Sequence, residues 1–116
     1  MNYLSIVAVM KDEGKNIKEW LDFHRGVGVE HFYLYDNGST DNTKSFCKGE
    51  DITYSYNTMD MCQTACYYNA LTAFKDQSKW MAFIDLDEFL FAPKGDLKER
   101  LKGFEQFPGV AVNEVF

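Results

Sequence analysis

The sequence is poor in basic residues, proline and cysteine, and it contains no long apolar run. Its longest apolar stretches, such as residues 6–10, fall far short of the ~20 residues that a membrane-spanning helix needs. The first residues also lack the basic stretch and apolar core of a secretory signal. We therefore expect no integral membrane segment and a cytoplasmic location.

The three cysteines, Cys47, Cys62 and Cys66, do not form a recognisable stabilising pattern. An odd number cannot pair into a complete disulfide framework, and no further Cys or His pair completes a zinc-binding pattern. We expect all three to be reduced residues that pack in the interior.

The charge balance is acidic, with 12 Lys and Arg against 18 Asp and Glu and a net charge of −6. Because binding to nucleic-acid phosphates needs clustered basic residues, and the sequence has no basic run, we expect no nucleic-acid partner. A hydrophobic content of 46% over 116 residues is enough for one core, so residues 1–116 are expected to form a single domain.

Short β-prone runs alternate along the chain with segments of helical periodicity. Ile17, Trp20, Leu21 and His24, for example, recur at the spacing of one helix face. Such alternation predicts an α/β fold with an open, mostly parallel sheet and helices on both faces. The expected strands are residues 3–9, 31–35, 52–56, 80–85 and 109–115, and the longest expected helix is 62–76.

Polar clusters follow three of the expected strands, at residues 11–16, 36–42 and 85–88. The carboxyl ends of parallel strands lie at one edge of a sheet, where open α/β sheets bind their ligands. The sequence therefore predicts one site at this edge, suited to a sugar, a nucleotide and a divalent cation.

Asp85 and Asp87 give the sharpest chemical signal. They stand at alternate positions directly after an apolar strand, so both carboxylates can face one hard cation. Taken alone, Asp-x-Asp is equally compatible with a hydrated loop. The concentration of negative charge, to which Glu88 adds a third carboxylate, favours a bound cation.

Asp36 ends the second expected strand and precedes the turn residues Asn37 and Gly38. Its carboxylate could accept a hydrogen bond from a ribose hydroxyl or a base N–H. An Asn-Gly turn followed by a helix-capping Ser or Asp is also an ordinary loop. Spacing alone leaves both interpretations open.

Three segments in this order resemble the nucleotide-sugar-binding half of a GT-A-fold glycosyltransferase of the family-2-like group. They are IVAVMKDE at residues 6–13, YDNGSTDNT at 35–43 and FIDLDEF at 83–89. The resemblance implies that Asp36 contacts the nucleoside and that Met10 and Glu13 line the pocket for base and ribose. Asn37, where many relatives have a second acid, belongs to the same set.

In the same resemblance, Asp85-Leu86-Asp87 is the motif that binds a divalent cation, Mg²⁺ or Mn²⁺. Asp87 is the implied direct ligand, and Asp85 faces the ribose or a metal-bound water. The implied reaction is metal-dependent transfer of a sugar from a nucleotide diphosphate sugar to an acceptor hydroxyl, with a saccharide as the expected acceptor. The catalytic base of inverting members follows these motifs, so the chain is expected to be an incomplete catalytic domain with no assigned catalytic residue.

Two alternatives remain open from the sequence. Asp85 and Asp87 also resemble the nucleophile and the acid/base of haloacid-dehalogenase-like phosphatases, although Gly-Thr normally follows that motif where Glu88 and Phe89 stand here. In the second alternative, the chain binds a nucleotide sugar without turning it over.

Overall fold

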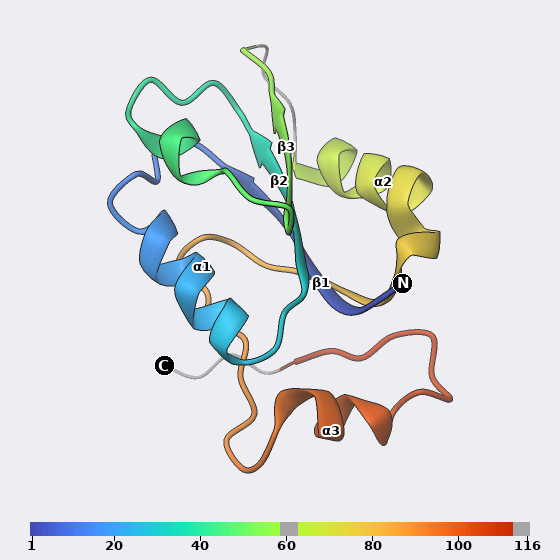
Figure 1. Cartoon of the computed structure of the whole chain (residues 1–116). Coiled ribbons are helices and arrows are strands. Elements are labelled where there is room, and N and C mark those ends of the chain that lie inside the picture. The colour runs from blue at the N-terminus through green and yellow to red at the C-terminus, as the bar shows by residue number, and fades with distance from the viewer. Residues whose placement is uncertain (59–62, 113–116) are drawn as a thin grey trace.

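The structure is a computed structural model that describes residues 1–58 and 63–112. Its centre is a four-stranded sheet in the order β3-β2-β1-β4, in which every neighbouring pair is parallel. The strands are β1 (Asn2–Met10), β2 (His31–Asp36), β3 (Ile52–Tyr56) and β4 (Ser78–Phe83) (Figure 1). The predicted α/β class with an open parallel sheet is confirmed.

Four of the five expected strands are present, but two details differ from the prediction. The strand expected at 80–85 lies at 78–83, because its pairing with β1 begins at Ser78 and ends where Phe83 pairs with Val7. The fifth expected strand is wrong for residues 109–112, which pair with no strand, while residues 113–115 lie outside the described part of the chain.

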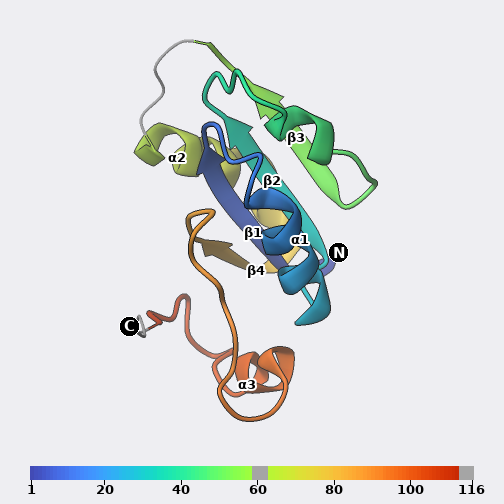
Figure 2. The same cartoon turned by 90° about the vertical axis from the view of Figure 1, so that its left-hand side faces the viewer.

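Helices cover both faces of the sheet, as predicted. The two longest, α1 (Ile17–Gly26) and α2 (Gln63–Phe74), lie on opposite faces, and α3 (Leu97–Lys102) lies beyond the amino-terminal end of β1 (Figures 1 and 2). Two short 3₁₀ turns, η1 (Thr43–Phe46) and η2 (Lys75–Gln77), complete the regular structure of the described residues.

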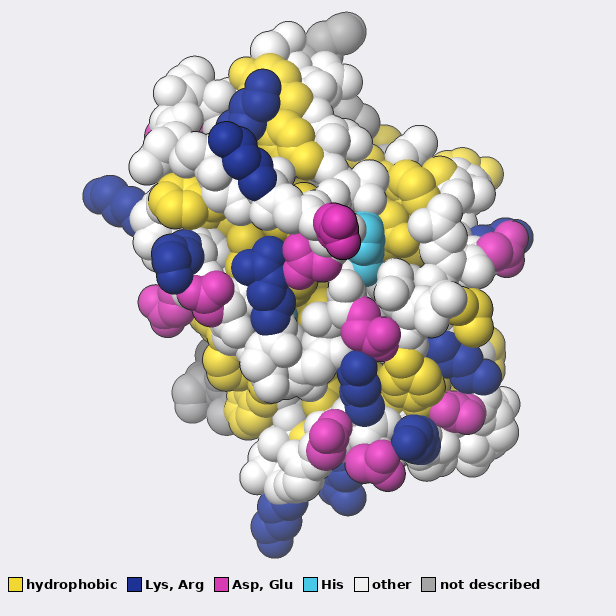
Figure 3. All heavy atoms as spheres, viewed as in Figure 1, with side chains coloured by type: hydrophobic (Ala, Val, Ile, Leu, Met, Phe, Trp, Pro, Cys, Tyr) yellow, Lys and Arg dark blue, Asp and Glu magenta, His cyan; other side chains and the backbone are white. Residues whose placement is uncertain are grey.

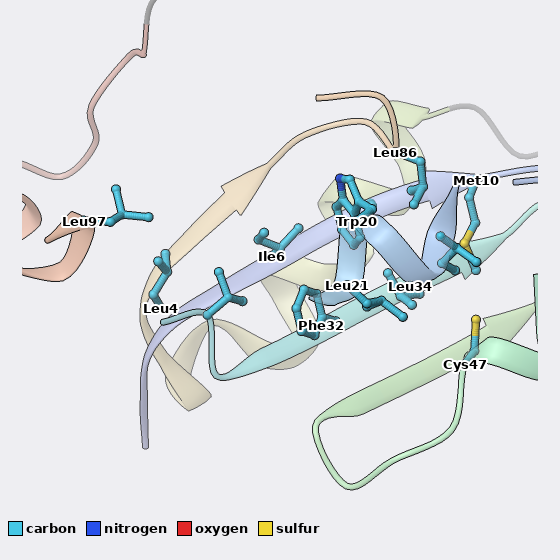
Figure 4. Close-up of a cluster of buried hydrophobic side chains, with 13 residues drawn as sticks. Leu4, Ile6, Met10, Trp20, Leu21, Phe32, Leu34, Cys47, Leu86 and Leu97 are labelled. Carbon is cyan, nitrogen blue, oxygen red and sulfur yellow. The ribbon is translucent and has the colours of Figure 1, made fainter. Parts of the chain in front are cut away.

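The larger core lies between α1 and the sheet (Figure 4). Side chains of a strand alternate between its faces, so Leu4, Ile6 and Met10 of β1 point toward α1 while Val7 points toward α2. Both faces of β1 are therefore buried, which explains its almost continuous apolar sequence. From α1, Trp20 fills this core and is 0% exposed.

The smaller core lies under α2, and small residues form its contact with the sheet. Cys66 and Ala70 are buried there, whereas the larger Leu71 of the same helix is 42% exposed. Small side chains let α2 approach Tyr33 and Tyr35 of β2 closely. Cys47 and Cys66 are buried, as expected, and Cys62 lies outside the described residues.

Charged side chains of both signs are intermingled on the face of the molecule shown in Figure 3. Within the described part of the chain, no helix has the length and apolar character needed to cross a bilayer.

Candidate functional site at the carboxyl edge of the sheet

Two adjoining pockets lie at the carboxyl ends of the four strands, and Asn37 lines both. We call the first the acidic pocket; it is lined by Val9, Met10, Lys11, Glu13, Asn37, Asp85, Leu86 and Asp87. We call the second the tyrosine pocket; it is lined by Tyr35, Asp36, Asn37, Ser55, Tyr56, Asn57, Cys66 and Asn69. The sheet is parallel, so chain segments far apart in sequence meet at this single edge.

The structure brings together the six residues that the sequence singled out. Five of them line the acidic pocket: Met10, Glu13, Asn37, Asp85 and Asp87. Asp36 lines the tyrosine pocket next to it. The three polar loops therefore converge at one place, as the arrangement of parallel strands predicts.

The carboxylate of Asp36 is buried and already has two hydrogen-bond donors. Its Oδ1 accepts from the backbone N–H of Ser39 at 2.9 Å, and its Oδ2 accepts from the hydroxyl of Tyr54 at 2.6 Å. Only 2% of Asp36 is exposed. Burial, together with this neighbouring carboxylate, raises the pKa of Tyr54, which keeps its proton for the bond. Asp36 thus fixes the shape of the loop that follows β2.

Asp12 joins the loop after β1 to the loop after β2. Its backbone N–H donates to Oγ of Ser39 at 2.8 Å, and its Oδ1 accepts from the N–H groups of Thr40 at 2.8 Å and Asp41 at 3.3 Å. The backbone of Asp12 is left-handed, with φ of 53°. These crossed bonds make the two loops one unit at the rim of the acidic pocket.

Glu13 is held in this unit through its backbone. Its N–H donates to Oγ1 of Thr43 at 2.9 Å, while its Oε2 accepts a long bond of 3.4 Å from Asn16. The next residue, Gly14, donates its N–H to Asp41 at 3.0 Å. The Asp41 carboxylate also accepts from the hydroxyl and N–H of Thr43, and these bonds lower its pKa. The backbone of Glu13 is therefore fixed, with its half-buried side chain on the pocket wall.

The Asp85–Glu88 turn follows β4 and is closed by two hydrogen bonds. Glu88 N–H donates to the carbonyl of Asp85 at 3.1 Å, and Oε1 of Glu88 accepts from the N–H of Asp85 at 2.8 Å. The sequence predicted Glu88 as a third carboxylate for a cation; the structure uses it to close the turn. In residues 1–58 and 63–112, no three Asp, Glu, His or Cys side chains gather closely enough to hold a metal ion.

Gln63 contacts the turn from the face of the sheet that α2 covers. It stands at the start of α2, and its Nε2 donates to Oδ1 of Asp85 at 2.8 Å. From the same helix, Tyr67 has its pKa raised by burial and by the negative charges of Asp85 and Glu88. The Asp85 carboxylate is therefore held by α2 while its backbone belongs to the turn after β4.

Two further contacts to this turn come from α1 and were not anticipated from sequence. Trp20 Nε1 donates to backbone carbonyls in the turn, and His24 accepts from a backbone N–H that follows it. Both residues have the apolar spacing of a helix face, which predicts burial but not these polar contacts.

Residues 7–113 match a protein-family model described as glycosyltransferase family 92. The chain is 28% identical over 85% of its length to a family 92 protein of Ricinus communis, and 25% identical over 92% to one of Oryza sativa subsp. japonica. It covers 19% of each of these two relatives, or about a fifth of their length. Because the family match takes in almost the whole sequence, the chain belongs to glycosyltransferase family 92.

Proposed function

We propose that this chain binds a nucleotide diphosphate sugar at the carboxyl edge of its sheet, as the donor half of a metal-dependent, GT-A-type glycosyltransferase. The observation that carries the proposal is the acidic pocket, because Met10, Glu13, Asn37, Asp85 and Asp87 line it together. The reaction is transfer of the sugar to a hydroxyl group of an acceptor, with a saccharide as the proposed acceptor.

The two pockets divide the donor into two parts. The tyrosine pocket, with the exposed ring of Tyr56 and the amides of Asn37 and Asn69, suits a nucleoside that needs both stacking and hydrogen bonds. The acidic pocket beside it then takes the diphosphate and the sugar. Asn37 lies between the two parts, since it lines both pockets.

The charges of the acidic pocket support a requirement for a cation. Three of the side chains that line this pocket are acidic, Glu13, Asp85 and Asp87, and one, Lys11, is basic. A diphosphate entering this pocket meets like charges, which is unfavourable unless a cation lies between them. Mg²⁺ is commonly held by one or two carboxylates together with substrate phosphates, so the pair Asp85 and Asp87 fits a metal that binds with the diphosphate.

In this proposal Asp87 is the direct metal ligand, and Asp85 faces the ribose or a metal-bound water. A bound Mg²⁺ or Mn²⁺ would neutralise the charge that develops on the leaving diphosphate. The protein's own contribution is to hold Asp85 through Gln63 and to fix the loops that carry Glu13 and Asn37. Membership of family 92 favours this function over the phosphatase alternative.

Isothermal titration calorimetry tests the proposal, with UDP, GDP, CDP and ADP as probes and with Mn²⁺ or EDTA in the buffer. We expect at least one nucleotide to bind more tightly with Mn²⁺, and we expect Asp87→Ala to remove most of that difference. Equal affinity for every nucleotide with and without the metal would contradict a metal-dependent donor site.

Asp76→Ala is the matched control for this experiment. Asp76 is an exposed carboxylate in η2, directly before β4, and so lies at the opposite edge of the sheet. Its removal changes the net charge by the same amount as Asp87→Ala but leaves the acidic pocket intact. Nucleotide affinity should therefore remain at the wild-type value in Asp76→Ala.

A further inference from the structure

One side chain of α1 binds both ends of the Asp85–Glu88 turn. The indole Nε1 of Trp20 donates to the carbonyl of Asp85 at 3.1 Å and to the carbonyl of Glu88 at 2.9 Å. Trp20 is fully buried, so water does not compete for this donor. A single N–H group therefore ties the first and last residues of the turn to the helix.

His24 makes a second attachment one helical turn further along α1. Its Nδ1 lies 2.8 Å from the carbonyl of Trp20, and because a carbonyl only accepts, Nδ1 carries the hydrogen. Nε2 is then the acceptor for the backbone N–H of Leu90, at 3.0 Å. The imidazole ring also stacks on Phe89, with centroids 5.7 Å apart. Both ring nitrogens of the neutral His24 are thus used.

The segment that Trp20 and His24 hold is not part of any helix or strand. Residues 84–96 contain neither helix nor strand. The N–H of Ile84 still donates to the Val7 carbonyl of β1 at 3.3 Å, and beyond Ile84 the position of the segment depends on side-chain contacts. Leu86 supplies one, since it is 3% exposed and belongs to the same core as Trp20 and Met10 (Figure 4). The residues on either side of Leu86 are Asp85 and Asp87, which are exposed and line the acidic pocket.

We infer that Trp20 and His24 are positioning residues of the donor site: they hold the Asp85–Leu90 backbone so that Asp85 and Asp87 are placed before a ligand arrives. Neither side chain lines either pocket, so both act through the turn. A site that is already ordered loses less conformational freedom on binding and therefore binds more tightly. The inference deepens the proposed donor site and rests on that function for its effect on affinity.

Trp20→Phe tests this inference, because it keeps a buried aromatic ring and removes the indole N–H. The first measurement is amide hydrogen exchange by NMR without ligand. We expect exchange in residues 85–90 to accelerate about tenfold relative to β1 and β2, as loss of one hydrogen bond implies. The second is calorimetry with UDP, GDP, CDP and ADP in the presence of Mg²⁺, where the tightest wild-type affinity should weaken by about fivefold or more.

Leu21→Ala is the matched control, since Leu21 neighbours Trp20, is 2% exposed and has no polar atom to offer the turn. It should accelerate exchange throughout the α1 core and leave nucleotide affinity unchanged at a temperature where the protein is folded. An equal loss of affinity in Leu21→Ala and Trp20→Phe, or normal protection of residues 85–90 in Trp20→Phe, would overturn the inference.

A second variant and a spectroscopic measurement complete the test. If Trp20→Phe does not fold, His24→Leu removes the acceptor of Leu90 together with the bond to the Trp20 carbonyl and the ring that stacks on Phe89. Exchange should then accelerate at residues 89–90. In the wild type, the indole resonance of Trp20 should shift on addition of nucleotide and Mg²⁺, while that of Trp80 should not. If the wild type binds none of the four nucleotides, the proposed function fails, and the exchange measurements alone then decide whether α1 holds the turn.

Discussion

The hydroxyl of Tyr54 on β3 donates a 2.6 Å hydrogen bond to the buried carboxylate of Asp36 at the end of β2. The two residues lie on adjacent strands, where Leu34 pairs with Tyr54 and Asp36 pairs with Tyr56. A buried carboxylate is costly unless hydrogen bonds replace the lost water, and Tyr54 supplies one of the two donors described for Asp36.

Tyr54→Phe should therefore destabilise the protein although it removes a single oxygen atom. We expect the free energy of unfolding to fall by about 1–3 kcal/mol, the cost of leaving a buried acceptor with one donor fewer. Urea denaturation measures the change. Tyr56→Phe on the same strand is the control, because Tyr56 is 47% exposed and its bond to the Ser39 carbonyl is long, at 3.3 Å. Equal losses in the two variants would contradict this role of Asp36.

His24 makes the stability of the fold depend on pH. Burial lowers its pKa, because the interior disfavours the charged imidazolium. Between the lowered pKa and the ordinary value of ~6.5, the unfolded chain binds more protons than the folded one. The contribution of neutral His24 to the free energy of unfolding is thus fully present above pH ~6.5 and is lost as the pH falls below that value.

The measurement is an NMR titration of the imidazole resonances combined with urea denaturation across the same pH range. His24 should titrate below ~6.5, and the free energy of unfolding should decrease as the pH falls through this region. His31 also has its pKa lowered by burial, although the charge of Asp51 opposes the shift. The pH profile is therefore recorded in His31→Asn as well, where the part due to His24 remains; a flat profile in that variant would refute the prediction.

The sequence was sufficient to predict the parallel sheet and the convergence of the three polar loops at one edge, because both follow from local patterns. The apolar runs at 2–10, 31–36 and 52–56 pair as parallel strands, and parallel strands place their following loops at one edge. The strand expected at 109–115 failed over residues 109–112, since a β-prone run also needs a neighbour with which to pair. Its local sequence says nothing about that neighbour.

The contacts that shape the site were not predictable in the same way. Trp20 and the Asp85 carbonyl are 65 residues apart in sequence, and a tryptophan at core spacing gives no sign of where its N–H points. Glu88 looked like a further cation ligand because composition does not distinguish a carboxylate that faces a pocket from one that caps its own turn. These contacts depend on how distant segments meet.

Asp12 offers a way to separate backbone strain from hydrogen bonding. Asp12→Gly keeps the left-handed backbone, with φ of 53°, and removes the carboxylate that binds Thr40 and Asp41. We expect this change to lower the free energy of unfolding by about 1 kcal/mol. Asp12→Ala removes the same bonds but keeps a Cβ atom in the unfavourable left-handed conformation. Its free energy of unfolding should therefore be about 1–2 kcal/mol lower than that of Asp12→Gly. Urea denaturation of both variants checks the difference, which should vanish if the loop simply changes conformation.

Glu88 provides the last prediction, which separates a turn-forming role from a catalytic one. Because Oε1 of Glu88 accepts from the N–H of Asp85, Glu88→Gln keeps the acceptor and should leave nucleotide affinity within about twofold of wild type. Glu88→Ala removes it and should weaken affinity by about fivefold.

The 116-residue chain itself should bind a nucleotide sugar yet transfer little sugar, since general-base catalysis needs a positioned group and Glu88 is engaged in the turn. The measurements are calorimetry and product formation with a saccharide acceptor. Robust transfer that Glu88→Gln abolishes, with nucleotide binding intact, would instead make Glu88 the base.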